Sequence, residues 1–164
     1  WGRRNYNICR RSDVRTGDAV TGRVLGIDFG TRRLGLAISD PSRTLARPLE
    51  VIAVRSDADA VDRVAGRIDQ LAAEDDGLAA IVVGLPGRLD GMPSDQTARV
   101  IAFISALERR TSLTIVTEDE RLSSREAESR LAVGERDWRR RKARLDAAAA
   151  AVVLQDYLDR RPSS

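Results

Sequence analysis

The 164-residue sequence contains no histidine, a single cysteine and few aromatic residues. Without histidine, Ser-His-Asp and Cys-His catalysis, histidine general bases and the usual zinc sites are excluded. The lone Cys9 excludes an intramolecular disulfide framework and any multi-cysteine metal cluster. Any chemistry that this chain performs must therefore rest on carboxylates.

Long apolar segments are also missing from the chain. No run approaches the roughly 18 apolar residues of a membrane span, and residues 1–21 lack the apolar core of a secretory signal. We therefore expect no membrane association and a cytoplasmic location. Apolar residues make up 42% of the chain, which predicts one globular domain over residues 22–160. Residues 1–21 are basic and aperiodic, so we expect a disordered extension there.

Positive charge is concentrated in two segments of a chain whose formal net charge is +3. Residues 1–21 contain five arginines and two aspartates, so they account for that +3 and the remainder is neutral by count. Residues 121–144 nevertheless carry nine basic and four acidic side chains, a local charge of +5. Such a segment suits the binding of a polyanion. The alternative is a solvated arginine-rich loop without a binding role.

Hydrophobic periodicity and turn residues predict five strands and four helices. The expected strands are residues 23–29, 33–39, 44–54, 80–85 and 113–117. The expected helices are residues 56–77, 94–110, 123–133 and 145–158. Between the last two helices we expect a basic loop over Gly134 through Lys142, with Trp138 in its middle.

The connections between these elements predict an α/β fold. Short turns join the first three strands, which makes them an antiparallel meander. The strand over residues 80–85 is apolar without alternation, so it should be covered on both faces and parallel to the first strand. Right-handed crossovers then give a mixed five-stranded sheet of order 3-2-1-4-5, flanked by helices, with strand 2 antiparallel.

Acidic residues stand at three comparable positions of this predicted fold. Asp28 ends the first strand, Asp119 and Glu120 end the fifth, and Asp146 is expected in the first turn of the last helix. Open α/β sheets bind ligands at the rim where parallel strands end. Three acids without basic partners repel one another unless cations neutralise them, and oxygen ligands favour Mg²⁺ or Mn²⁺. We therefore predict that Asp28, Glu120 and Asp146 hold two such ions, with Asp119 as a second ligand or a water-orienting acid.

Each acid also has a purely structural explanation. Asp28 could cap the turn that follows it, and Asp146 could be favoured by the dipole of its helix. Asp119 and Glu120 could lie in a solvated turn with Arg121 as their partner. Adjacent strand residues face opposite sides, so the sequence leaves open which of Asp119 and Glu120 points inward.

Four segments of the chain stand out: Gly26–Gly35, Ile81–Pro86 with Asp90-Gly91, Asp119–Ser124 with Glu126-Ala127, and Leu145–Ala150 with Leu154-Gln155. Taken together, they resemble the YqgF/RuvX family, a branch of the ribonuclease-H-like nucleases related to Holliday junction resolvases. The segments occur in the order and spacing of that family. Around Pro86–Leu89 the family more often has a polar residue such as asparagine, and this departure bears on substrate contacts.

The resemblance implies a ribonuclease-H-like fold and a divalent-metal nuclease with acidic ligands at Asp28, Glu120 with Asp119, and Asp146. It implies a hydrolase acting on structured RNA, foremost the 5′ end of precursor 16S ribosomal RNA. A resolvase that cuts branched DNA as a homodimer and a noncatalytic nucleic-acid binder are the alternatives. Both monomer and homodimer stay open.

Substrate contacts are expected from the first turn and from the basic segment. Trp138 either stacks on a base or anchors its loop. Asp28-x-Gly30-Thr31 also opens sugar-kinase and actin-type ATPases, but 164 residues leave no room for their second domain. The expected substrate-binding residues are Gly30, Thr31, Arg121, Trp138, Arg140, Arg141 and Lys142.

Overall fold

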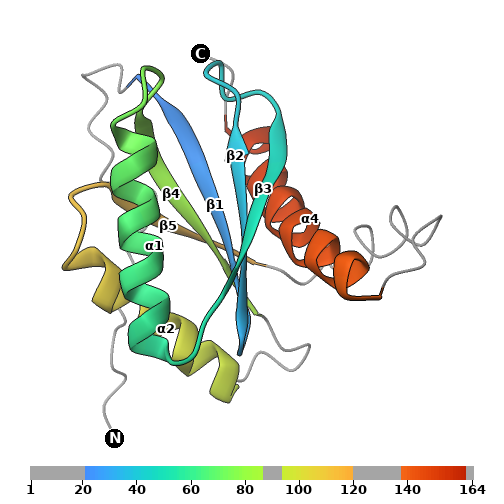
Figure 1. Cartoon of the computed structure of the whole chain (residues 1–164). Coiled ribbons are helices and arrows are strands. Elements are labelled where there is room, and N and C mark those ends of the chain that lie inside the picture. Colours follow the sequence, from blue (N-terminus) through green and yellow to red (C-terminus); the bar gives the residue numbers. More distant parts are fainter. Residues whose placement is uncertain (1–20, 87–93, 120–137, 162–164) are drawn as a thin grey trace, which may run out of the picture.

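The computed structural model describes residues 21–86, 94–119 and 138–161, and there it forms a sheet with helices on both faces (Figure 1). Among the described helices, none is both long enough and apolar enough to cross a membrane. The five predicted strands are confirmed, with their ends within two residues of expectation. The strands are β1 (Arg23–Phe29), β2 (Arg33–Ser39), β3 (Ala46–Ala53), β4 (Leu78–Leu85) and β5 (Thr114–Asp119). The helices are α1 (Asp57–Ala72), α2 (Asp95–Glu108) and α4 (Trp138–Asp159).

The sheet has the order β3-β2-β1-β4-β5, as the sequence predicted. β2 is antiparallel to both of its neighbours, whereas β1, β4 and β5 run parallel to one another. The carboxyl ends of β1, β4 and β5 therefore share one rim. That rim is the end of the sheet where the sequence places Asp28 and Asp119.

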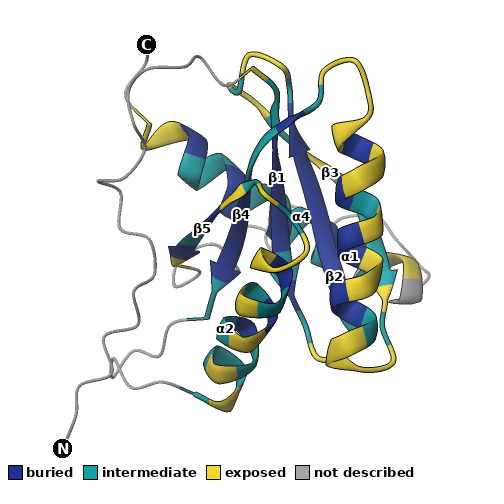
Figure 2. Ribbon diagram, turned by 90° about the vertical axis from the view of Figure 1, so that its left-hand side faces the viewer, coloured by how far each residue is buried: buried dark blue, intermediate teal, exposed yellow. Residues whose placement is uncertain are grey.

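Each face of the sheet carries its own apolar layer, because successive strand residues point to opposite sides. On one face Leu25 and Ile27 of β1 belong to the cluster that includes the inner residues of α1 and α2. On the other face Val24 of β1 and Val82 of β4 pack with Leu154 of α4. Figure 2 shows β1, β2 and β4 largely buried between these helices, while the outer surfaces of α1 and α2 are exposed.

Two glycines allow α4 to lie directly on the sheet. A Cβ atom on Gly26 of β1 would lie 2.8 Å from the Leu154 Cβ atom and 3.1 Å from the Ala150 carbonyl oxygen. A Cβ atom on Gly35 of β2 would lie only 1.9 Å from the carbonyl oxygen of Asp146. A side chain at either glycine would therefore push α4 away from β1 and β2.

Gln155 fastens α4 to the edge of the sheet. Its Oε1 atom accepts from the Ala46 N–H at 2.8 Å, and its Nε2 atom donates to the Thr44 carbonyl at 3.0 Å. Ala46 is the first residue of β3, an edge strand of the sheet, and Thr44 lies two residues before it. Together with the two glycines, this side chain fixes where α4 crosses the sheet.

Two predicted boundaries differ from the structure. Helix α4 begins at Trp138, so the basic loop predicted through Lys142 is wrong over residues 138–142. Helix α1 has Ser56 as its N-cap, as predicted, but ends at Ala72, before Gly77. Residues 1–20 of the extension predicted over 1–21, the predicted helix over 123–133 and residues 134–137 lie outside the described ranges.

Candidate active site

Asp28 is half-buried near the end of β1, on the sheet face that α4 covers. Its carboxylate forms no hydrogen bond or ion pair with any residue in the described ranges. The turn that follows is closed by the Gly30 N–H, which donates to the Arg33 carbonyl at 2.9 Å. The turn therefore forms without a cap from Asp28, which removes the structural explanation for this acid.

Asp146 reaches the same place from the far end of the chain. In the β1–β2 ladder Asp28 stands opposite Gly35. The Asp146 carbonyl occupies the space that a Cβ atom of Gly35 would fill. Because directly opposed residues of paired strands lie about 5 Å apart, α4 carries Asp146 to within about one strand spacing of Asp28.

The carboxylate of Asp146 has an arginine partner, contrary to the expectation of acids without basic partners. The Arg33 Nε atom lies 3.6 Å from the Asp146 Oδ2 atom, and the two side chains are 28% and 30% exposed. Arg33 precedes Gly35 by two residues on β2, so both lie on the face of Asp28. The Asp146 carboxylate is thereby directed toward the rim where β1 ends.

The position of Asp146 within its helix also differs from expectation. Asp146 lies eight residues after Trp138, the first residue of α4, and so more than two turns inside the helix. The dipole of a helix acts within its first turn. Stabilisation by the helix N-terminus therefore does not explain this acid.

The acids at the end of β5 point to opposite faces of the sheet. Glu118 is 9% exposed, and its Oε1 atom accepts from the Arg160 guanidinium at the end of α4. Asp119 is exposed, and by strand alternation it shares the face of Ile115, which packs with α1 and α2. Asp119 thus lies on the other face from Asp28, and Glu120 is outside the described residues.

Sequence reasoning missed the pairing of Glu118 with Arg160. The available signal was strand alternation, which puts Glu118 on the same face as Val116 and therefore toward α4. Its buried carboxylate holds the C-terminal end of α4 against β5. This ion pair fastens the helix that carries Asp146.

Helix α2 donates two side-chain hydrogen bonds to the same rim from the other face of the sheet. The Gln96 side chain donates to the Phe29 carbonyl at 2.8 Å, immediately after Asp28. The Thr97 hydroxyl donates to the Pro86 carbonyl at the end of β4 at 3.0 Å. Ser94 and Thr97 form a capping box, so the first turn of α2 is itself well defined. The ends of β1 and β4 are consequently held from α2.

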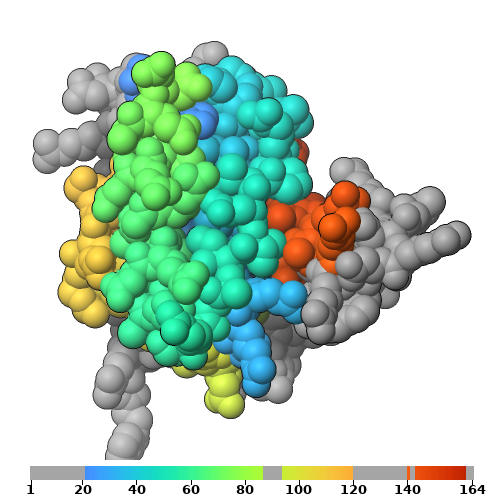
Figure 3. Space-filling view, viewed as in Figure 1, coloured from blue at the N-terminus to red at the C-terminus, as the bar shows by residue number. Residues whose placement is uncertain are grey.

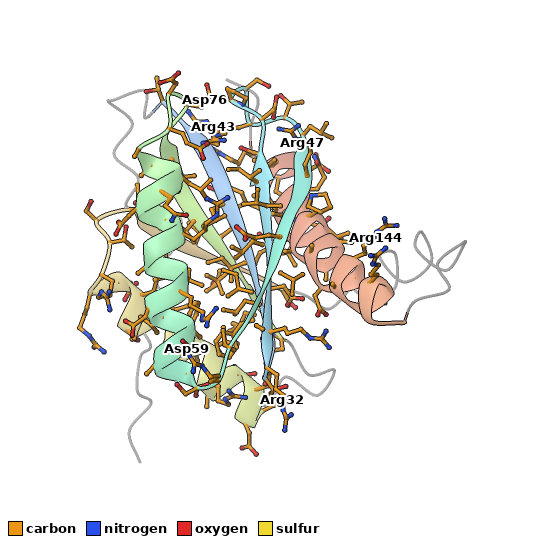
Figure 4. The ribbon with its side chains drawn as sticks, viewed as in Figure 1. Arg32, Arg43, Arg47, Asp59, Asp76 and Arg144 are labelled. Atoms are coloured by element: carbon orange, nitrogen blue, oxygen red, sulfur yellow. The ribbon has the colours of Figure 1, made fainter. Side chains whose placement is uncertain are left out.

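Of the predicted substrate-binding residues, the structure fully describes Gly30, Thr31 and Arg140. Thr31 is exposed on the β1–β2 turn, whereas the Gly30 N–H is already used within that turn. Of the predicted residues on α4, Arg140 is exposed. Arg144, one turn later and outside the predicted set, is exposed as well, and Figure 4 shows it on the outer side of the helix. Trp138, Arg141 and Lys142 belong to α4 without described side chains, and Arg121 lies outside the described ranges.

A groove of about 550 Å³ lies between β3 and the N-terminal half of α4. In Figure 3 the orange surface of α4 borders the surface of β3. The groove is apolar apart from Glu50 and Arg144, and Asp28 does not line it. Its lining residues are Pro48, Leu49, Glu50, Val51, Ala143, Arg144, Ala147 and Ala148.

The donor chemistry around Asp28 fits a hard divalent cation. Asp28 and Asp146 supply carboxylate oxygens from two elements on one sheet face, and oxygen is what Mg²⁺ and Mn²⁺ prefer. The described part of the chain contains no group of three metal-ligating side chains, and the third predicted ligand, Glu120, lies outside it. Of the three predicted ligands, Asp28 and Asp146 are therefore the two whose placement the structure describes.

Comparison with a solved structure identifies the fold. Over 87% of this chain and 97% of the other, the structure resembles Thermus thermophilus RuvC in complex with a Holliday junction substrate, with a TM-score of 0.51 and 18% identity. The fold is therefore the ribonuclease-H-like fold that the sequence predicted.

The family follows from the sequence comparisons. Residues 22–160 match the family model described as RuvX, Holliday junction resolvase. A protein of Maridesulfovibrio salexigens named "Putative pre-16S rRNA nuclease" is 43% identical over 84% of this chain and 98% of its own length. A Desulforudis audaxviator protein of the same name is 36% identical over 86% and 96%. The chain belongs to the RuvX family, and the predicted nuclease class is confirmed.

Proposed function

We propose that this chain is a divalent-metal-dependent phosphodiesterase that cleaves structured RNA, with precursor 16S ribosomal RNA as its substrate. The observation that supports this most strongly is the approach of α4 to β2 at Gly35, which brings Asp146 beside Asp28. Two carboxylates from remote parts of the chain, one of them without a protein partner among the described residues, suit a shared cation.

In this proposal Asp28, Asp146 and Glu120 hold the cations. We choose Glu120 rather than Asp119 as the third ligand, because Asp119 is exposed on the opposite face of the sheet from Asp28. Two Mg²⁺ or Mn²⁺ ions, when bound, would hold the attacking and leaving oxygens of a phosphodiester in line. The chain contains no histidine for this task, so its carboxylates carry it.

Other residues of the chain would hold the substrate around that centre. The Thr31 hydroxyl is exposed on the turn next to Asp28 and can donate to a phosphate oxygen. Arg140 and Arg144 lie on the outside of α4, on the same helix as Asp146. Arginine binds phosphate with two parallel N–H donors, so this side of α4 suits the backbone of a nucleic acid.

The substrate assignment draws on the names of the relatives. The proteins from Maridesulfovibrio salexigens and Desulforudis audaxviator are both named for pre-16S rRNA, and each matches this chain over nearly its own full length. Contacts to phosphates carry no sequence information. We therefore propose that the structure of the precursor, rather than its base sequence, is what this site recognises.

The proposal is tested by replacing Asp28 with asparagine. Purified protein with Mn²⁺ is incubated with a 5′-extended fragment of 16S ribosomal RNA, and the rate of cleavage is measured. We expect Asp28→Asn to lower the rate at least about a hundredfold, since an amide binds divalent cations far less well than a carboxylate. Asp76→Asn is the matched control, because Asp76 is exposed at the opposite end of the molecule (Figure 4). Equal rates for wild type and Asp28→Asn would refute the proposal.

A second candidate function is cleavage of branched DNA. It is favoured by the description of the matching family model as a Holliday junction resolvase. Symmetric cleavage of a four-way junction needs two active sites and hence a homodimer. A dimer by light scattering, with paired nicks in a four-way junction and no cleavage of the RNA fragment, would favour this function. Binding of either substrate without cleavage under Mn²⁺ would instead indicate a noncatalytic nucleic-acid binder.

A further inference from the structure

We propose that Arg33 acts as the resident counter-charge of the metal centre and sets its affinity for divalent cations. The inference rests on the proposed function, since it concerns the same site. Arg33 would be a positioning residue: its guanidinium balances the Asp146 carboxylate when no cation is bound, and competes with a cation for that carboxylate.

The first support is the contact itself. The Arg33 Nε atom lies 3.6 Å from the Asp146 Oδ2 atom, close enough for an ion pair but longer than a good hydrogen bond. Both side chains keep more than a quarter of their surface exposed. A pair of this kind is weak and is readily exchanged for another partner.

The second support is the place of Arg33 on the sheet. The Arg33 carbonyl closes the β1–β2 turn by accepting from the Gly30 N–H, so its backbone is fixed. Gly30 itself cannot be replaced without strain, because a Cβ atom there would lie 2.4 Å from that carbonyl. Arg33 is therefore held two residues from Gly35, on the sheet face that Asp28 shares and α4 covers. Its side chain extends toward the site from a fixed backbone position.

The third support is the imbalance between the two acids. Asp146 has an arginine beside it, whereas Asp28 has no charged partner among the described residues. The backbones of Asp28 and Asp146 lie about one strand spacing apart, and negative charges held so close repel each other in the metal-free protein. The Arg33 charge relieves part of that repulsion. A divalent cation that binds both acids removes the need for Arg33, whose charge then opposes the cation.

Two effects of opposite sign follow for Arg33→Gln. Without metal, the variant should unfold at a lower temperature than wild type, because the repulsion between the acids is no longer balanced. Its affinity for Mn²⁺ should rise about three- to tenfold, since the competing charge has gone. A salt bridge with only a structural role would lower stability and leave the Mn²⁺ affinity unchanged.

The experiment measures Mn²⁺ binding to the full chain by calorimetry, and thermal unfolding in chelator. Arg32→Gln is the matched control: Arg32 precedes Arg33, is exposed on the turn and loses the same charge. Arg33→Lys keeps the charge and should bind Mn²⁺ within about twofold of wild type. In chelator, Arg33→Gln should lower the unfolding temperature when Asp146 is present, but should have little effect on it in an Asp146→Asn background.

The outcomes separate this inference from the proposed function. Tighter Mn²⁺ binding by Arg33→Gln, with Arg32→Gln unchanged, is the expected result. Equal affinities for Arg33→Gln and wild type, or the same shift in both glutamine variants, would overturn the role of Arg33 while leaving the metal site intact. If wild type itself binds no Mn²⁺, the metal site is absent and both proposals fall.

Discussion

The carbonyl oxygen of Asp146 sits 1.9 Å from the point where a Cβ atom of Gly35 would stand. Gly35 is also the cross-strand partner of Asp28. One missing side chain on β2 therefore allows a helix from the end of the chain to reach a strand from its beginning. The candidate metal site exists because of this close approach.

The first prediction concerns this contact. Gly35→Ala should destabilise the protein by about 1–3 kcal/mol, because the backbone of α4 must move away from β2. Displacement of Asp146 should also reduce Mn²⁺ binding. The free energy of unfolding is measured in urea and the affinity by calorimetry.

Gly66→Ala is its control. Gly66 lies in α1, and a Cβ atom there would meet nothing within 4 Å. Alanine in a helix interior should stabilise by about 0.5–1 kcal/mol and leave Mn²⁺ binding unchanged. If Gly35→Ala also left stability and binding unchanged, α4 would not lie on β2 as closely as described.

A second prediction concerns the pair that fastens the end of α4. Arg160→Ala removes the guanidinium beside the buried Glu118 carboxylate and should destabilise the protein by about 1–3 kcal/mol. Arg161→Ala is the neighbouring control, since Arg161 is exposed and lies 5.7 Å from the Tyr157 ring centroid. Arg161→Ala should lower the free energy of unfolding by less than about 1 kcal/mol. Equal losses for the two variants in urea denaturation would contradict this assignment of Arg160.

A third prediction concerns pH. The Leu45 N–H, the Ser42 hydroxyl and the Thr44 N–H all donate to Asp40 in the β2–β3 turn, and they hold its pKa at about 2, below its ordinary value of 3.8. Because the folded pKa is depressed, the stabilisation is complete above pH about 4 and is lost as the pH falls through about 2.

Asp40→Asn should therefore lower stability at neutral pH, with a difference from wild type that shrinks between pH 4 and pH 2. Urea denaturation at a series of pH values measures this difference. Asp75→Asn is the comparison variant, because Asp75 is exposed on the turn after α1. A constant difference between Asp40→Asn and wild type across that range would show that the turn does not hold an ionised Asp40.

The sheet could be predicted because its signals are local. Apolar strands such as Ile81–Leu85, with turns at Gly30 and Asp40, determine how many strands there are and which neighbours are antiparallel. Handedness then leaves one order for the parallel strands. This is why β3-β2-β1-β4-β5 follows from sequence alone.

The start of α4 could not be found in this way. Arg139 through Lys142 carry four like charges and no apolar stripe, and positive charge is unfavourable at a helix N-terminus. Periodicity therefore begins only at Leu145, and the first two turns look like a loop. Arginine and lysine are nevertheless good helix formers, and the helix continues through them.

The pairing of Arg33 with Asp146 also could not be predicted from local sequence patterns. It depends on where α4 crosses the sheet, which is decided by Gly26, Gly35 and the hydrogen bonds of Gln155. Small residues at alternate positions on adjacent strands were the available signal for a close helix. They do not indicate which residue of the helix lies over them.

The most direct measurement is the anomalous diffraction of manganese in crystals soaked in Mn²⁺. The proposed function predicts a manganese peak with carboxylate oxygens of both Asp28 and Asp146 at about 2.1 Å, the distance typical of such ions. A second peak should share the carboxylate of Glu120. Crystals with no manganese between Asp28 and Asp146, although Mn²⁺ supports cleavage in the same solution, would contradict the site.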